Sequence, residues 1–271
     1  MSPVFIALLL CLGTATGFLA GLLGIGGGML LVPFLTMLFT AHAFPRQHVL
    51  HMAVATALTT ILFTSVSSVR AHQRRSAVRW DIVKAMAGGA FLGTFLGAQL
   101  ASQLRTRWLA IFFAVFVGYS GLTMLRNAHR TTADKSRPLF GPLGLFGAGS
   151  GIGFISSLVG AGGGFITVPF LSGCRVLIHE AVATSAAMGF PIAAGGLIGY
   201  VLAGWNVQGL PRLTFGYIYL PALIACAITS VLTAPLGARA AHALDVNSLK
   251  KIFAVLLIGL AMYMAWEAYG A

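Results

Sequence analysis

The sequence predicts an all-α integral membrane protein with two homologous, inverted repeats, each a glycine-broken helix or hairpin followed by three transmembrane helices. Of its 271 residues, 58% are hydrophobic and 8% are charged, whereas soluble domains carry roughly 25% charged residues. Apolar runs of about 20 residues recur along the chain, which is the length of a helix that crosses a bilayer. An internal duplication defines the two repeats.

The duplication is clearest in a glycine motif. The stretch "GLLGIGGGMLLVPFL" (residues 21–35) returns as "SLVGAGGGFITVPFL" (residues 157–171), with nine of the fifteen positions identical. Three further landmarks follow in the same order: "HMAVATALTT" with "HEAVATSAAM", "LGAQLASQL" with "LGARAAHAL", and "IFFAV" with "KIFAV". We therefore divide the chain into a first transmembrane repeat (1–126), a polar cytoplasmic linker (127–138) and a second transmembrane repeat (139–271).

Each repeat contains the same series of expected elements. A glycine-interrupted apolar stretch comes first and three spans follow it, at about 3–41, 48–69, 82–103 and 107–126 in the first repeat and about 139–174, 181–203, 214–239 and 250–268 in the second. If the interrupted stretch crosses the membrane once, each repeat has four spans and the repeats are parallel. If it folds back as a hairpin, or crosses twice, the repeats are inverted.

The basic residues favour inverted repeats. Cytoplasmic loops of membrane proteins carry an excess of Lys and Arg, so we place the loop "RAHQRRSAVRWDIVK" inside the cell. Parallel repeats then leave ten of the 17 Lys and Arg inside and seven outside, whereas inverted repeats leave thirteen inside and four outside. The inverted arrangement puts both termini outside, together with the four remaining basic residues, Arg46, Arg105, Arg107 and Arg212.

The paired glycines are expected to form a substrate site. Glycine adopts positive φ angles and lets a ligand approach the backbone, and a helix that restarts after a break presents unpaired N–H groups that attract anions. Corresponding breaks in two inverted repeats are typical of a transporter's central site, while close helix packing by small residues is the alternative. The candidate substrate-binding residues are Gly26, Gly27, Gly28, Met29, Gly162, Gly163, Gly164 and Phe165, and the helix-break residues are Gly24, Pro33, Gly160 and Pro169.

A few polar side chains extend the candidate site. Thr56, Thr184 and Ser185 lie in the paired "AVAT" motifs and are candidate substrate ligands, with a hydroxyl bonded to its own helix carbonyl as the alternative. Four residues at matched positions are candidates for gating or coupling: His51, His179, Gln99 and Arg239. Helix capping by the histidines and membrane anchoring by the arginine are the alternatives. All five acids lie at or near the ends of segments, which favours an anion over a cation as cargo.

Other functional classes lack the residues they need. A Walker loop requires Gly-Lys-Ser/Thr after its glycines, whereas Met29 and Phe165 follow them here. A membrane enzyme would need a cluster such as HExxH or paired acids, and the sequence contains none. The three cysteines are scattered without ligand spacing, so no metal site is predicted. The basic residues fall mostly in short loops, which argues against nucleic-acid binding. A structural or assembly subunit would need no central polar cavity, so the paired glycine breaks argue against this class as well.

The same motifs resemble the TauE/SafE family of sulfite and organosulfonate exporters. The paired "LLGIGGGMLLVPFL" and "LVGAGGGFITVPFL" and the following "HMAVATA" and "HEAVATS" carry the resemblance, which covers essentially the whole chain. It implies a multi-pass secondary transporter of the bacterial inner membrane that exports sulfite or an organosulfonate by alternating access, with the anion at the glycine motifs. One departure is that Ala57 stands where the second repeat has Ser185, which would make the half-sites unequal.

Two alternatives concern the cargo and its direction. Thiosulfate, sulfate, a carboxylate or another small solute could replace the sulfur oxyanion, and the protein could be an importer. The expected partners are a small anionic substrate and the lipid bilayer, with protons as the candidate coupling ion and a homodimer as the candidate assembly. We expect no cofactor, no metal and no nucleic acid.

Overall fold

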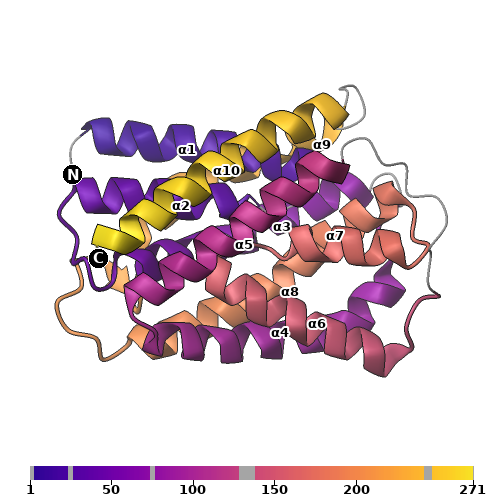
Figure 1. Cartoon of the computed structure of the whole chain (residues 1–271), viewed down its shortest axis with the longest axis horizontal. Helices are drawn as coiled ribbons and strands as arrows, with labels where there is room; N and C mark the ends of the chain where they lie inside the picture. Colours follow the sequence, from indigo (N-terminus) through magenta and orange to yellow (C-terminus); the bar gives the residue numbers. More distant parts are fainter. Residues whose placement is uncertain (1–2, 24–26, 74–76, 128–137, 241–245, 271) are drawn as a thin grey trace.

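The computed structural model describes residues 3–23, 27–73, 77–127, 138–240 and 246–270, and within them the chain is almost entirely helical (Figure 1). The helices are α1 Pro3–Leu23, α2 Gly28–Ala41, α3 Val49–Gln73, α4 Trp80–Gln103, α5 Thr106–Asn127, α6 Pro142–Val159, α7 Gly164–Gly173, α8 Ile178–Gly204, α9 Leu220–Ala240 and α10 Val246–Gly270. The all-α prediction is confirmed. Most of the predicted linker, 128–137, lies outside the described residues.

Six of the described helices are long and apolar enough to cross a membrane: α1, α3, α5, α6, α8 and α9. A helix satisfies its backbone hydrogen bonds within itself, which is the requirement for a segment that crosses hydrocarbon. The α3 and α8 helices are the most deeply buried of the six and form the centre of the bundle. Their cores are rich in alanine, so neighbouring helices approach them closely.

Both glycine-broken stretches fold back as hairpins. Phe5, in the first turn of α1, contacts His42, just after the end of α2, with ring centroids 4.1 Å apart. In the second repeat Phe140, just before α6, stacks on Phe170, near the end of α7, at 6.0 Å. Each glycine-interrupted stretch therefore returns to the end of the bundle from which it started. A single crossing of the membrane by this stretch does not fit such a return.

Helices of one repeat pack on helices of the other in a reciprocal pattern. The first helix of each repeat lies along the fourth helix of the other, α1 on α9 and α6 on α4, and α5 pairs with α10. Of the corresponding helices, α3 and α8 pack directly and run antiparallel: Leu58 contacts Gly196 near one end of the pair, and Ser65 contacts Gly189 toward the other. Antiparallel packing of corresponding helices is the arrangement expected for inverted repeats.

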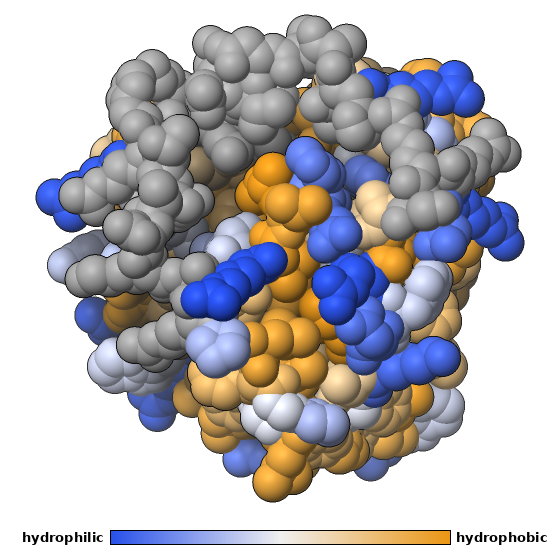
Figure 2. Space-filling model, turned by 90° about the vertical axis from the view of Figure 1, so that its right-hand side faces the viewer, coloured by the Kyte–Doolittle hydropathy of each residue, from blue (hydrophilic) through white to orange (hydrophobic). Residues whose placement is uncertain are grey.

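Both ends of the bundle carry basic residues. α1 begins and α10 ends at the left of Figure 1, and the connections that carry Arg46, Arg105 and Arg212 lie at this end. The opposite end contains the last turns of α3 and α9, with Arg70, His72 and Arg239. Figure 2 looks onto this second end, where strongly hydrophilic residues surround hydrophobic surface. That it faces the cytoplasm stays a prediction from the charge bias.

One expected span begins later than predicted. The sequence predicts a helix from residue 214, but α9 begins at Leu220, and the preceding segment forms a two-stranded hairpin of β1 (Thr214–Phe215) and β2 (Ile218–Tyr219). The turn contains Gly216 in the left-handed conformation, with φ 57°, which a continuous helix cannot accommodate. The apolar run alone did not reveal this turn.

Candidate functional site

The two glycine breaks have the same backbone geometry. Gly27 and Gly163 precede α2 and α7 and both adopt left-handed conformations, with φ 65° and 77°, which glycine adopts without steric cost. The carbonyl oxygen of Gly27 accepts the N–H groups of Leu30 and Leu31, and the carbonyl of Gly163 accepts the corresponding two in α7. The first N–H groups of each restarted helix have no acceptor within the helix and carry a partial positive charge.

The two breaks contact each other at the centre of the molecule. Gly28, the first residue of α2, lies against the carbonyl oxygen of Gly160, and a β-carbon at position 28 would also approach the Ile61 side chain to 2.8 Å. Gly160 ends α6 in the left-handed conformation, with φ 69°. A side chain at Gly28 would collide with backbone of the other repeat. Glycine is therefore required here both for conformation and for close approach.

A small polar cavity of about 10 Å³ lies beside this contact. The cavity is lined by Ala20 and Ile61, which adjoin Gly27 and Gly28, and by Gly162 of the second break. Its hydroxyl groups come from α3 and α8: Thr64, Ser65, Ser68 and Ser185. A cavity of this size holds about one water molecule. The structure therefore has a small space next to both breaks whose lining includes four hydroxyl groups.

The α3 hydroxyls in this cavity are only partly satisfied. Thr64 Oγ1 is 2.8 Å from Ser230 Oγ of α9, and Ser65 donates to the Leu62 carbonyl at 3.0 Å. Ser68 Oγ is buried and has no hydrogen-bond partner among the described residues. A buried hydroxyl without a partner is costly, so this one is available to a bound ligand or water. Sequence reasoning missed these α3 residues, although the hydroxyl-rich run "TSVSS" within an apolar span indicates them.

The threonines of the "AVAT" motifs connect the two repeats. Thr56 Oγ1 accepts the backbone N–H of Tyr219 at 3.1 Å, and Thr184 Oγ1 accepts that of Arg79, also at 3.1 Å. Each donor immediately precedes the fourth helix of the opposite repeat. Ser185 lines the cavity, whereas the two threonines do not. Binding of substrate by these threonines stays a prediction, and their hydroxyl hydrogens remain able to donate.

The four gating candidates lie apart from the cavity and differ within each pair. His51 is buried, and its Nε2 bonds the carbonyls of Ala101 and Leu104 at 3.1 and 3.0 Å, which fastens the start of α3 to the end of α4. His179 is exposed. Gln99 donates to the Gly199 carbonyl at 3.0 Å, whereas Arg239 is exposed. Beside His51, burial lowers the pKa of His48, which favours its neutral ring.

Four further predicted residues fall into two groups. Gly24 and Gly26 lie outside the described residues. Pro33 and Pro169 lie inside α2 and α7, at the sixth residue of each helix, and not at the breaks themselves. No group of three His, Cys, Asp or Glu in the described part of the chain could hold a metal ion.

Comparison with known proteins agrees with this architecture. Residues 9–264 match the family model "Sulfite exporter TauE/SafE". A probable membrane transporter protein of Haemophilus influenzae is 35% identical over 96% of this chain and 98% of its own length. One of Methanocaldococcus jannaschii is 26% identical over 96% of each chain, and one of Xylella fastidiosa (strain Temecula1) is 25% identical over 96% of this chain. No solved structure matches the chain.

These matches and the apolar helices together make the protein a multi-pass membrane protein of the transporter class. The resemblance drawn from the paired glycine motifs is therefore confirmed over nearly the full length. The chain belongs to the TauE/SafE family.

Proposed function

We propose that this protein is a secondary transporter that exports a small sulfur oxyanion, sulfite or an organosulfonate, across the bacterial inner membrane by alternating access. The anion would bind between the two glycine breaks. The observation that carries this proposal is the contact between Gly28 and Gly160 beside a hydroxyl-lined cavity. The name of the family supports the sulfur oxyanion as cargo.

The chemistry around the breaks suits an oxyanion. The restarted helices α2 and α7 offer backbone N–H groups whose partial positive charge favours anions. The hydroxyl of Ser68 adds a donor, and the cavity lining contains no carboxylate that would repel an anion. The antiparallel packing of α3 on α8 supports inverted repeats, which are the usual basis of alternating access. The cavity of about 10 Å³ is too small for an oxyanion, so it must widen to admit substrate.

Another small anion is the second candidate, as exported or imported cargo. Hydroxyl and backbone N–H donors bind sulfite, thiosulfate, sulfate and carboxylates through the same contacts, and the cavity lining contains no Lys or Arg that would select for charge. We keep protons as the candidate coupling ion and a homodimer as the candidate assembly.

Transport by the purified protein in liposomes tests the proposal. Flux of labelled sulfite and taurine is measured under an imposed voltage or pH gradient, with unlabelled acetate and sulfate as competitors. We expect saturable sulfur-oxyanion flux that Gly163→Val abolishes, because a β-carbon there lies 2.5 Å from Ile192 and the φ angle is positive. Gly147→Val is the matched control, since position 147 faces open space. Loss of the labelled flux when acetate or sulfate is added would move the assignment to the second candidate, and equal flux in both variants would contradict the site.

A further inference from the structure

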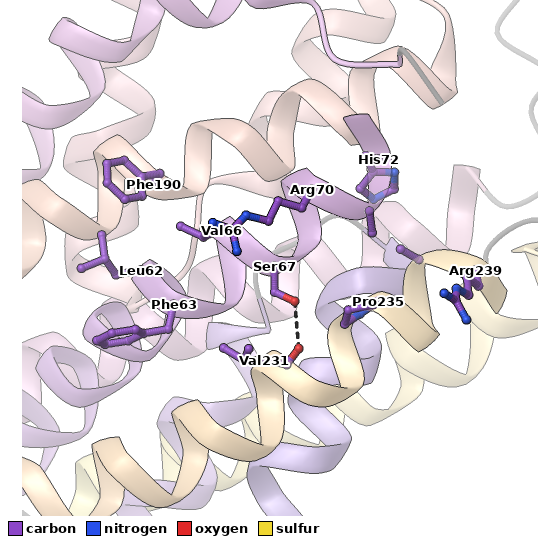
Figure 3. A pocket seen from close by; sticks show the side chains of 12 residues that line it. Leu62, Phe63, Val66, Ser67, Arg70, His72, Phe190, Val231, Pro235 and Arg239 are labelled. Atoms are coloured by element: carbon purple, nitrogen blue, oxygen red, sulfur yellow. Dashed lines mark hydrogen bonds between the residues drawn. The ribbon is translucent and has the colours of Figure 1, made fainter. Parts of the chain in front are cut away.

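A large groove lies between α3, α8 and α9, on a different part of α3 from the polar cavity (Figure 3). Its volume is about 880 Å³, against about 10 Å³ for the cavity beside the breaks. One part of its lining is apolar and the other is basic: Leu62, Phe63, Val66, Phe190, Val231 and Pro235 form the apolar part, and Arg70, His72 and Arg239 lie toward the ends of α3 and α9.

The apolar part of the groove opens sideways. Phe63 and Phe190 are 47% and 48% exposed, and both belong to helices that can span the membrane. Their exposed faces would therefore contact hydrocarbon rather than water. Arg70 follows Phe63 by seven residues on the same helix, which corresponds to about 10 Å along the helix axis. The groove thus extends from hydrocarbon depth toward one membrane surface.

Among the described residues, the basic part of the groove has no opposing charge. No acid lines the groove, and the ion pairs among the described residues are those of Arg79 with Asp81 and Glu180. Arg70 and Arg239 are both exposed. Figure 3 shows the Arg70 side chain extending over Val66, inside the groove. In the same view Arg239 lies on the far side of Pro235, so the two guanidinium groups stand at separate places along an apolar groove. Such a groove complements a molecule with an anionic head and an apolar tail.

The duplication provides an internal comparison. Arg239 corresponds to Gln99, and Arg70 corresponds to Ile198. At that second interface the helices are in contact, and Gln99 donates to the Gly199 carbonyl. The groove and its two arginines therefore occur on one side of the molecule and near one membrane surface only.

We propose that this groove binds an anionic phospholipid from the leaflet at the basic end of the bundle. The anionic head group lies between Arg70 and Arg239, whose side chains turn toward it from opposite sides, and one acyl chain lies along Phe63 and Phe190. Basic pockets between transmembrane helices at this depth bind anionic head groups by the same combination of charge and apolar contact. This inference is independent of the transported substrate.

Lipid binding to the purified protein in detergent tests the inference. Native mass spectrometry follows titration with phosphatidylglycerol, with phosphatidylcholine as the uncharged comparison. We expect the double variant Arg70→Gln/Arg239→Gln to bind phosphatidylglycerol about thirtyfold more weakly, with phosphatidylcholine unchanged. The control, Arg105→Gln/Arg107→Gln at the opposite end, should bind like wild type. Equal phosphatidylglycerol affinity in wild type and the double variant would overturn the inference.

A second variant keeps both arginines and fills the apolar part. Val66→Trp should weaken binding of phosphatidylglycerol because the indole occupies the path of the acyl chain. The soluble head group, glycerol phosphate, should bind at least a hundredfold more weakly than the lipid to wild type, because it lacks the apolar contact. Glycerol phosphate affinity equal to that of the lipid would instead identify a simple anion site and overturn the proposal.

Discussion

Two interfaces that correspond by duplication, α8 with α4 and α3 with α9, pack differently. In the first, Gly195 lies against the carbonyl oxygen of Phe91. One turn later, a β-carbon on Gly199 would be 2.7 Å from the β-carbon of Ala98, so the two backbones touch. This interface stays closed along its length.

The second interface begins in the same way and then opens. Ser67, which corresponds to Gly195, donates to the Val231 carbonyl at 2.8 Å, so the first contact is preserved with a side chain in place of bare backbone. Beyond it, Ala71 and Pro235 stand where the first interface has Gly199 and Phe95, and these residues line the groove. Close backbone approach in membranes depends on small residues. The opening therefore lies where Ala71 replaces glycine and Pro235 replaces phenylalanine.

The largest expected effect separates the two interfaces directly. Gly199→Leu should lower the free energy of unfolding by about 1–3 kcal/mol, because the new side chain collides with Ala98 and the Phe95 carbonyl. The corresponding Ala71→Leu extends into the groove and should change it by less than about 0.5 kcal/mol. Thermal unfolding in detergent, followed by tryptophan fluorescence, measures both. Equal destabilisation would mean that the interfaces do not differ in closeness.

The two threonine hydrogen bonds that connect the repeats are equivalent, so their loss should lower the stability equally. Thr56→Val and Thr184→Val each remove the acceptor of one backbone N–H, which is buried at Tyr219 and partly buried at Arg79, and each should cost about 1 kcal/mol. Matched serine variants, which keep the hydroxyl, should retain more of the stability. A loss at one threonine only, in the same unfolding assay, would show that the two connections are not equivalent.

The smallest expected effect concerns Gln99 and Arg239, which occupy corresponding positions of α4 and α9 at the two interfaces. Gln99→Leu removes the hydrogen bond to Gly199 and should cost about 0.5 kcal/mol. Arg239→Leu removes an exposed side chain and should leave stability unchanged within error. If Arg239→Leu proved the more destabilising in chemical unfolding, the open interface would have to contain a contact that the structure lacks.

The sequence predicted the elements of this fold better than their contacts. The spans, the duplication and both glycine breaks follow from apolar runs and from glycine at matched positions. The basic residues favoured inverted repeats, which require such a return, but the contact of Phe5 with His42 depends on packing between distant segments that the sequence alone does not specify. The same applies to the turn at Gly216, since an apolar run predicts burial and not the conformation of one residue.

The candidate site was predicted in part. Gly27, Gly28, Gly160 and Gly163 lie together at the centre, as paired breaks suggest. The hydroxyls of Thr56 and Thr184 instead bond backbone of the opposite repeat, an interaction that a motif cannot reveal because its partner lies about 100 or more residues away. The sequence places Ser68 on α3, but only the packing of α3 against its neighbours shows that its hydroxyl lines the cavity.

The most direct test of the central claim is binding of labelled sulfite to the purified protein at equilibrium, compared among wild type, Gly163→Val and Gly147→Val. An anion held between the glycine breaks predicts saturable binding to wild type and Gly147→Val and none to Gly163→Val, with all three proteins equally folded by circular dichroism. Saturable binding of equal affinity to all three proteins would contradict a site at the breaks.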